Sequence, residues 1–262
     1  MNTTFYKYHG TGNDFILIDN RDRHFDSNDT KTIKFLCDRH FGIGADGLML
    51  LEEHDELDFT MRYFNSDGNE ATMCGNGGRC ISAFAVHSGL IKDPGHFRFM
   101  AVDGIHEAKY SDGIVSLKMS DVNNITYNKE YLFLDTGSPH HVSFVEDIDK
   151  SDVFSSGRKI RYSEKYVKQG GTNVNFVEQT DADSIKVRTY ERGVENETLS
   201  CGTGVVASAI SAAVRQGFGN HFKVEVRGGV LSVDFELDND KKAKNIWLTG
   251  PATFVFKGEI DI

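Results

Sequence analysis

Two cysteines stand in matching glycine-rich segments of this 262-residue chain. Cys74 opens the sequence Cys-Gly-Asn-Gly, and Cys201 opens Cys-Gly-Thr-Gly about half the chain length later. In each copy a glutamate, Glu70 or Glu197, precedes the cysteine by four positions, and small and apolar residues follow it. An internal repeat of this kind predicts two similar half-molecules. Each half would present a thiol at the N-terminus of a helix.

A thiol at a helix N-terminus has distinctive chemistry. The first backbone amides of a helix lack partners within it and carry partial positive charge, so they can bind a carboxylate. A thiol beside them ionises more readily than free cysteine, whose pKa is about 8.5. Two such helix ends would hold one carboxylate between two ionisable sulfurs. The alternative is that each cysteine is a small buried hydrophobe, but the repetition of the whole turn favours the functional interpretation.

The segments that follow the two cysteines indicate how the thiols are positioned. Helices are expected roughly over 77–87 and 204–215, and both segments are apolar on nearly every face. A helix of this kind must be buried on all sides. Short strand candidates surround both segments, with turn residues at the spacing of an all-β or α+β domain. We therefore predict an α+β fold of two similar domains, each a curved sheet or barrel around one central helix.

Smaller features complete this picture. Asp29 to His40 has helical spacing, with Cys37 on its buried face, and Asp29 or Asn28 could cap that helix. The polar stretch 121–124 predicts a domain boundary, with domains over 1–121 and 122–251. In the turn 9–14, Asn13 could face a ligand or only bond the local backbone.

Composition excludes several classes of function. The net charge of −10 and the pI near 5.4 argue against binding to nucleic acid, which requires a basic face. No apolar run approaches the length of a membrane span, and the N-terminus lacks the pattern of a signal peptide. Four cysteines in such a chain indicate a reduced, cytoplasmic protein rather than disulfides. Their spacing does not fit a zinc site.

With these residues assembled, the sequence resembles the diaminopimelate epimerase family nearly from end to end. The resemblance implies two barrel-like domains, each around a central helix, with the active site in the cleft between them. It also implies that the last strand, over 252–262, returns to the first domain. The motifs that carry the resemblance are His9-Gly-Thr-Gly-Asn-Asp-Phe15, Gly42-Ile-Gly-Ala-Asp-Gly47, Phe64-Asn-Ser-Asp-Gly68, Met73-Cys-Gly-Asn-Gly-Gly-Arg-Cys80, Thr172-Asn-Val-Asn-Phe176, and Tyr190-Glu-Arg-Gly193 followed by Cys201-Gly-Thr-Gly204.

The resemblance also implies a role for each matching residue. Cys74 and Cys201 match the catalytic cysteines. The amides that hold the carboxylate of the reacting carbon match Gly75, Asn76, Gly202 and Thr203. The residues that hold the rest of the substrate match Asn13, Asn65, Asn173, Glu191 and Arg192, and the positions that influence thiol ionisation match His140 and Glu191.

Three departures from the family pattern concern recognition of the substrate's far end. Ser138 stands where the family usually has an asparagine, and it remains a candidate substrate contact. Gly47 stands where some members have a glutamine ligand. The turn between Arg192 and Cys201 carries one extra residue.

The implied activity is a cofactor-independent interconversion of LL- and meso-diaminopimelate, in lysine and cell-wall precursor biosynthesis. One thiolate removes the Cα proton and one thiol delivers a proton to the opposite face, while helix N-termini meet the developing charge. We expect a small-molecule substrate, no cofactor, no metal, and a homodimer. Two alternatives remain open: a proline-type racemase of the same fold, and a non-catalytic redox-sensing thiol pair.

Overall fold

The structure is a computed structural model that describes residues 2–262. It divides into two compact units. The first unit comprises the chain up to Leu117 together with Gly250–Ile262, and the second comprises Lys118–Thr249. Each unit is described by itself below.

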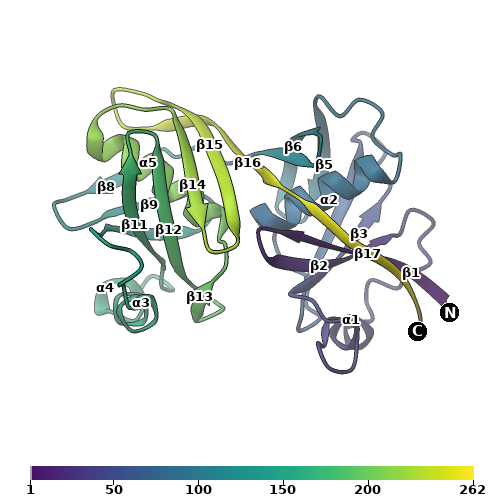
Figure 1. The fold of residues 1–262 in the computed structure, drawn as a ribbon. Coiled ribbons are helices and arrows are strands. Elements are labelled where there is room, and N and C mark those ends of the chain that lie inside the picture. The colour runs from purple at the N-terminus through teal and green to yellow at the C-terminus, as the bar shows by residue number, and fades with distance from the viewer. Residues whose placement is uncertain (1) are drawn as a thin grey trace. The chain divides into compact units, whose positions relative to one another are not determined.

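The first unit contains a sheet in which the last strand of the chain lies beside the first. The strand order is β17-β1-β2-β3-β4-β5-β6-β7, in which the pairs β2–β3 and β4–β5 are parallel and the other neighbours are antiparallel. Asn2 pairs with Asp261, so the two ends lie side by side (Figure 1). The strands are β1 (Asn2–Gly10), β2 (Asn13–Asp19), β3 (Gly47–Glu52), β4 (Phe59–Asn65), β5 (Phe97–Ala101), β6 (Gly104–Ser111), β7 (Ile114–Lys118) and β17 (Thr253–Asp261).

The second unit repeats this pattern. Its order is β8-β9-β10-β11-β12-β14-β15-β16, with β10–β11 and β12–β14 parallel, the other neighbours antiparallel, and β13 also paired with β12. The strands are β8 (Ile125–Tyr127), β9 (Leu132–Asp135), β10 (Pro139–Phe144), β11 (Asn173–Asp181), β12 (Ser184–Glu191), β13 (Asn196–Thr198), β14 (His221–Val226), β15 (Gly229–Leu237) and β16 (Ala243–Pro251).

Helices make the crossovers that the parallel pairs require. In the first unit α1 (Thr30–Cys37) connects β2 to β3, and α2 (Gly75–His87) connects β4 to β5. In the second unit α3 (Val153–Arg161) and α4 (Glu164–Val167) lie between β10 and β11, and α5 (Gly202–Gln216) precedes β14. The repeat seen around the two cysteines therefore extends to the topology of both units, which confirms the predicted α+β fold with two similar domains.

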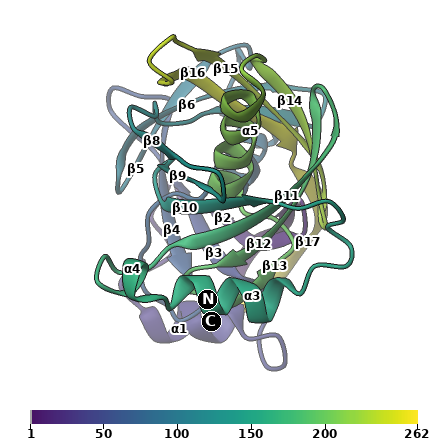
Figure 2. The ribbon, with the colours of Figure 1, turned by 90° about the vertical axis from the view of Figure 1, so that its left-hand side faces the viewer.

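The two long helices are the cores of their units. Every residue from Gly75 to Ala85 of α2 is buried, as is every residue from Gly204 to Val214 of α5. Helix α2 packs on β1, β2, β3 and β6, and α5 packs on β9, β10, β11, β12, β14 and β15 (Figure 2). Both helices begin two residues before the predicted start, since burial outweighs the low helix propensity of glycine. No helix among residues 2–262 is long and apolar enough to cross a membrane.

Helix α1 is shorter than its sequence pattern predicts. Asp29 caps it as expected, with its carboxylate accepting from the backbone N–H of Thr32, and Cys37 is buried. The helix ends at Cys37 rather than at His40 because Asp38 adopts an extended backbone conformation. The Asp38 carboxylate then accepts from the backbone N–H groups of His40 and Phe41, which supports a turn in place of another helical turn.

Candidate active site

Both repeated cysteines are the N-cap residues of the buried helices. Cys74 precedes α2, and its Sγ accepts a hydrogen bond from the backbone N–H of Gly77 at 3.2 Å. Cys201 precedes α5 and is 7% exposed. The backbone of each cysteine is extended, so that its helix begins at the following glycine, Gly75 or Gly202. The prediction that each half presents a thiol at a helix N-terminus is confirmed.

The glutamate that precedes each cysteine binds an arginine on the strand before the turn. Arg62 donates to Glu70 through two nitrogens, at 2.7 and 2.9 Å, and Arg188 donates to Glu197 in the same way, at 2.7 and 2.8 Å. Paired N–H donors of this kind give a directional contact with a carboxylate. The structure therefore repeats the ion pair as well as the motif, and each pair joins the two ends of the loop that leads to a thiol.

Beside α2, two of the predicted substrate-binding residues lie in contact. The side chain of Asn76 donates to Asn13 Oδ1 at 3.3 Å, and the side chain of Asn13 donates to Asp46 at 2.5 Å. Arg79, the only charged residue of α2 before His87, donates to Asn76 Oδ1 at 3.0 Å. These four residues form a continuous line of side-chain hydrogen bonds that starts in the first turn of the helix.

Asp46, at the end of that line, belongs to a cluster of charged residues with Lys7, Asp14 and Arg39. Arg39 donates to Asp46 at 2.7 Å and contacts Asp14 through two nitrogens, and Lys7 forms an ion pair with Asp14 at 2.7 Å. Burial acts to raise the pKa of the Asp14 carboxyl, but hydrogen bonds from Arg39 and Lys7 outweigh it and lower the pKa well below its usual range. Asp14 is therefore ionised at neutral pH.

Beside α5, Thr203 connects Cys201 to a buried histidine. The Thr203 hydroxyl lies 3.5 Å from Cys201 Sγ and 2.9 Å from His140 Nε2. The other ring nitrogen, Nδ1, lies 3.0 Å from the side-chain nitrogen of Asn175. That nitrogen also donates to the backbone carbonyl of His141 at 3.2 Å, and Asn175 Oδ1 accepts from Thr189 at 2.9 Å. These partners fix the orientation of the Asn175 amide.

The fixed amide determines the protonation of His140. Because the nitrogen of Asn175 can only donate, His140 Nδ1 accepts and Nε2 carries the proton. Burial lowers the pKa of His140 to about 3, and the charge of Arg192 acts in the same direction. The ring is thus neutral and donates to Thr203, which leaves the hydroxyl proton of Thr203 available to Cys201 Sγ.

Three of the residues predicted to hold the far end of a substrate form a second cluster in the same unit. Asn173 donates to Ser138 Oγ at 2.8 Å and accepts from the backbone N–H of Arg192 at 2.9 Å. The Arg192 guanidinium reaches Ser138 Oγ at 3.5 Å. Next to it, Glu191 accepts from the Thr198 hydroxyl at 2.8 Å. Ser138, where the family pattern has an asparagine, therefore lies within the predicted distal group.

Comparison with known proteins assigns the chain to a family. The family model described as diaminopimelate epimerase matches residues 5–127 and 132–255. The chain belongs to the diaminopimelate epimerase family. It is 51% identical to the diaminopimelate epimerase of Flavobacterium psychrophilum over 97% of this chain and 99% of that protein. It is 39% identical to the diaminopimelate epimerase of Aquifex aeolicus over 98% and 97% of the two chains.

Solved structures extend the likeness of fold beyond the family. A phenazine biosynthesis protein of the PhzF family from Bacillus anthracis matches with a TM-score of 0.76 at 15% identity, over the whole of both chains. A probable proline racemase from Agrobacterium radiobacter matches with a TM-score of 0.70 at 15% identity, over 99% of this chain and 93% of that one. Similarity at this level of identity establishes the shared fold alone.

The departure from the epimerase family pattern at Gly47 has a structural counterpart. Gly47 pairs with Asn65, the last residue of β4, which is exposed. A Cβ at position 47 would lie 2.5 Å from the Phe64 carbonyl oxygen and 2.6 Å from the ring of Tyr63. The Tyr63 ring thus fills the space into which a side chain at position 47 would extend.

The two remaining cysteines are in a different setting. Cys37 and Cys80 are buried, and burial raises the pKa of the Cys37 thiol to about 12 and that of Cys80 further above its usual value. Burial of an ionisable thiol in apolar surroundings makes it inert. Cys37 is the last residue of α1 and Cys80 lies inside α2, so neither stands at a helix N-terminus as Cys74 and Cys201 do.

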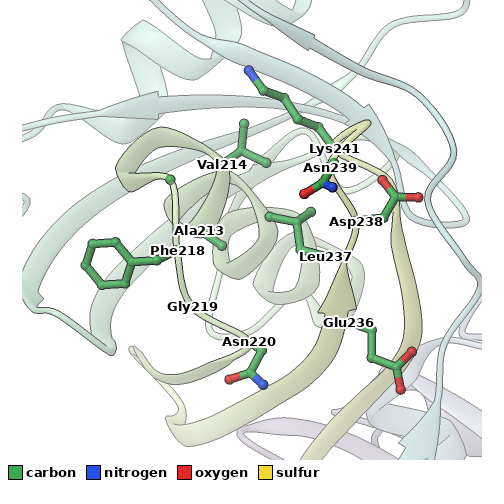
Figure 3. A pocket seen from close by; sticks show the side chains of 11 residues that line it. Ala213, Val214, Phe218, Gly219, Asn220, Glu236, Leu237, Asp238, Asn239 and Lys241 are labelled. Carbon is green, nitrogen blue, oxygen red and sulfur yellow. The ribbon is translucent and has the colours of Figure 1, made fainter.

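The hollow shown in Figure 3 lies at the other end of α5 from Cys201. It has a volume of about 540 Å³ and is bordered by the loop between β15 and β16. None of the predicted site residues lines it, so it is separate from the candidate site. Its lining residues are Ala213, Val214, Gly217, Phe218, Gly219, Asn220, Glu236, Leu237, Asp238, Asn239 and Lys241.

Three residues with a supporting position were not predicted from the sequence. Asp46 and Asn175 are parts of motifs that carry the family resemblance, but nothing in their spacing indicates which neighbour they bind. Arg79 also lies in such a motif, and its charge interrupts a largely apolar helix. A charged residue inside a helix that must be buried on all sides requires buried hydrogen-bond partners.

Proposed function

We propose that this chain interconverts LL- and meso-diaminopimelate with Cys74 and Cys201 as its two acid–base groups. The observation that carries the proposal is that a chain of this family has each of these cysteines as the N-cap of a buried helix. Inversion at an α-carbon requires removal of a proton from one face and delivery of a proton to the other. One sulfur acts as thiolate and the other as thiol, and their roles exchange in the reverse direction.

The helix N-termini supply the electrostatic part of the reaction. As the Cα proton leaves, negative charge moves into the α-carboxylate. The first backbone N–H groups of α2 and α5, at Gly75, Asn76, Gly202 and Thr203, are oriented donors for that charge. Preorganised donors at the place where charge develops commonly supply the largest single contribution to catalysis. No cofactor is required in this scheme.

The far end of the substrate is assigned to the cluster of Ser138, Asn173 and Arg192. Diaminopimelate carries a second ammonium and carboxylate pair, and an arginine can grip a carboxylate with two N–H donors. Glu191 is assigned to the positively charged group, and Asn13 and Asn65 complete the set from the first unit. A substrate without a charged far end, such as proline, would leave this cluster without a partner.

Solvent exchange provides the decisive experiment. The purified chain is incubated with LL-diaminopimelate in D2O that contains a metal chelator and no added cofactor, and product is analysed by NMR before equilibrium. The meso product should contain one deuterium at the inverted carbon. Absence of both epimerisation and exchange would contradict the proposed function, and exchange on proline but not on diaminopimelate would favour the racemase alternative.

Four matched variants test the assignment of the thiols. Cys74→Ala and Cys201→Ala should each lower epimerisation by at least about 1,000-fold, because each removes one of two required groups. Cys37→Ala and Cys80→Ala should stay within about 10-fold if circular dichroism shows that they fold. Turnover near that of the wild type in Cys74→Ala or Cys201→Ala would exclude the two-base scheme. Loss of epimerisation in the first pair also separates catalysis from a role in redox sensing.

Two further assignments belong to this proposal. We place the enzyme in the cytoplasm, where a reducing environment keeps both thiols free. We also propose a homodimer, which sedimentation at micromolar concentration would distinguish from a monomer of 29.3 kDa.

A further inference from the structure

Arg79 is a buried cation without an acidic partner. Its side chain is fully buried in α2, and no ion pair to it exists among residues 2–262. Burial lowers the pKa of Arg79 to about 10, so the guanidinium remains charged at neutral pH. An unpaired buried charge is costly unless hydrogen bonds satisfy it. Such a residue in the helix that carries Cys74 requires an explanation.

The guanidinium is held by oxygen acceptors near the first turn of α2. It donates to the Gly75 carbonyl at 3.0 Å, to Asn76 Oδ1 at 3.0 Å and to the Thr11 hydroxyl at 3.2 Å. It also donates to the Pro251 carbonyl at 3.4 Å. Two of these acceptors belong to the residues whose amides are assigned to the substrate carboxylate, and the other two come from distant parts of the chain.

The partners of Arg79 determine the orientation of two asparagine side chains. An arginine has donors only, so Asn76 must turn its oxygen towards Arg79 and its nitrogen towards Asn13. Asn13 then accepts with its oxygen and donates with its nitrogen to Asp46. An ionised aspartate has acceptors only. A donor-only residue at one end and an acceptor-only residue at the other therefore fix both amides in the same direction.

We propose that Arg79 and Asp46 are positioning residues for the reaction, which fix the side-chain orientations of Asn76 and Asn13. This inference rests on the proposed function, in which Asn13 contacts the substrate and the backbone N–H of Asn76 contacts its α-carboxylate. In the fixed orientation, the side-chain nitrogen of Asn13 donates to Asp46, and the side-chain oxygen of Asn13 accepts from Asn76. A reversed Asn76 would place its nitrogen against the donors of Arg79, and a reversed Asn13 would offer the substrate an acceptor where the fixed orientation offers a donor.

Gly10 is part of the same arrangement. It pairs with Asn13 across the β1–β2 turn, and a Cβ on it would lie 2.9 Å from the Asn76 carbonyl oxygen and 3.2 Å from an Arg79 nitrogen. The glycine thus allows the first turn of α2 to lie directly against β1. Gly10→Ala would displace Arg79 and Asn76 without removing any hydrogen-bonding group.

Substitutions at the two ends of the line, Arg79 and Asp46, are expected to raise KM by different amounts. Arg79 is fully buried, whereas the side chain of Asp46 is 44% exposed and water can replace it in part. We expect Arg79→Gln to raise KM for diaminopimelate by about 30-fold, since a glutamine can donate or accept and no longer fixes Asn76. Asp46→Asn should raise KM by about 5-fold. Arg79→Lys keeps the charge and the donor-only character, and it should retain more affinity than Arg79→Gln.

A double-mutant cycle tests the proposal. Arg79 and Asp46 share no hydrogen bond or ion pair with each other in the described chain, and the side chains of Asn76 and Asn13 connect them. If both residues act through this line of hydrogen bonds, the increase in KM in the double variant should be much smaller than the product of the two single increases. The reason is that after one substitution the amides of Asn76 and Asn13 are already free to rotate. Multiplicative effects in the double variant would overturn the proposal.

Controls separate positioning from general damage. Arg21→Gln and Asp22→Asn change a surface arginine and a surface aspartate outside the line, and each should leave KM unchanged. If Arg79→Gln does not fold, the cycle is run with Asp46→Asn and Gly10→Ala, and multiplicative effects there would again overturn the proposal. Wild-type turnover of diaminopimelate is measured first, so that failure of the proposed function is distinguished from failure of this inference. Equal increases in KM in Arg79→Lys and Arg79→Gln would also contradict the proposal that Arg79 is a positioning residue.

Discussion

The first turns of α2 and α5 share a motif but are supported by different chemistry. In α2 the side chain two residues after the cysteine, Asn76, is held by a buried arginine and a line that ends on a carboxylate. In α5 the equivalent side chain, Thr203, is held by a neutral histidine that an asparagine orients. Five residues after the cysteine, α2 has Arg79 and α5 has the buried Val206.

This difference shows which parts of a repeat are constrained. The backbone is constrained, because the proposed reaction requires a helix N-terminus to present its amides and a thiol at the same place in both units. The residues that orient the side chain two positions after the cysteine can differ between the units, provided that every buried donor and acceptor has a hydrogen-bond partner. The proposed two-base reaction needs one charged and one neutral sulfur. Supports of unequal charge are consistent with two sulfurs that are not equivalent.

Among changes to the residues that support the two turns, the largest effect is expected from reversing the direction of the hydrogen bonds around His140. Asn175→Asp places an acceptor opposite His140 Nδ1, so that in the neutral ring this nitrogen carries the proton and Nε2 no longer donates to Thr203. We expect kcat/KM to fall roughly 100-fold, which corresponds to about 2.7 kcal/mol of transition-state stabilisation. Asn175→Leu, which removes the partner without reversing the direction, is the matched comparison. Activity of Asn175→Asp equal to the wild type would show that a neutral, donating His140 is not needed.

The glycines three residues after each cysteine should respond differently to the same substitution. A Cβ at Gly204 would lie 2.4 Å from Asn175 Oδ1, whereas a Cβ at Gly77 would lie 3.2 Å from Cys74 Sγ and 3.3 Å from Met49 Sδ. Gly204→Ala should therefore lower the free energy of unfolding by about 2–3 kcal/mol, as other overpacked buried sites do, and Gly77→Ala by about 1 or less. Denaturant unfolding measures both, and equal losses would mean that the two turns tolerate side chains alike.

The sequence predicted the repeat and the thiols better than their supports. The positions of Cys74 and Cys201 at helix N-termini follow from local patterns, as does the burial of both helices. The partners of Arg79 do not, because Thr11 and Pro251 lie 68 and 172 positions away along the chain. In the same way, the end of α1 at Cys37 depends on the conformation of Asp38, which helical periodicity does not report.

The charged residues beside α2 and the neutral histidines beside α5 should also lose their contributions to stability at different pH. Burial lowers the pKa of His140 to about 3 and that of His141 to about 4, from 6.5 in the unfolded chain. Below pH 6.5 the unfolded state binds more protons, so stability falls as pH decreases, by about 1.4 kcal/mol for each of these histidines at pH 5.5. Asp14 has a lowered pKa, so its contribution in the first unit is lost only as pH falls below its unfolded value of 3.8.

Denaturant unfolding at pH 7.5 and pH 5.5 measures this difference. The wild type should lose stability between the two values, and His140→Gln should lose about 1.4 kcal/mol less over the same interval. Asp14→Asn should leave the change over this interval as it is in the wild type, since Asp14 stays ionised throughout. A loss of the same size in His140→Gln and the wild type would contradict a neutral His140 in the folded protein.

Modest effects are expected at the repeated ion pairs, where the burial of each pair determines which loss is larger. The side chains of Arg188 and Glu197 are 20% and 12% exposed, and those of Arg62 and Glu70 are 27% and 33% exposed. Arg188 also donates to the carbonyls of Ile148 and Ser151, so it is held in place whether or not the glutamate is charged.

Glu197→Gln should therefore destabilise the second unit by about 1–2 kcal/mol, because Arg188 keeps its position but loses its counter-charge in a partly buried site. Glu70→Gln should cost under about 1 kcal/mol, which is usual for a pair that water reaches. The loss in Glu70→Gln should also shrink in 0.5 M salt, since screening already weakens the exposed pair in the wild type. Thermal unfolding of both variants at two salt concentrations checks the order, and a larger loss in Glu70→Gln would mean that the first turn, rather than the second, depends on its ion pair.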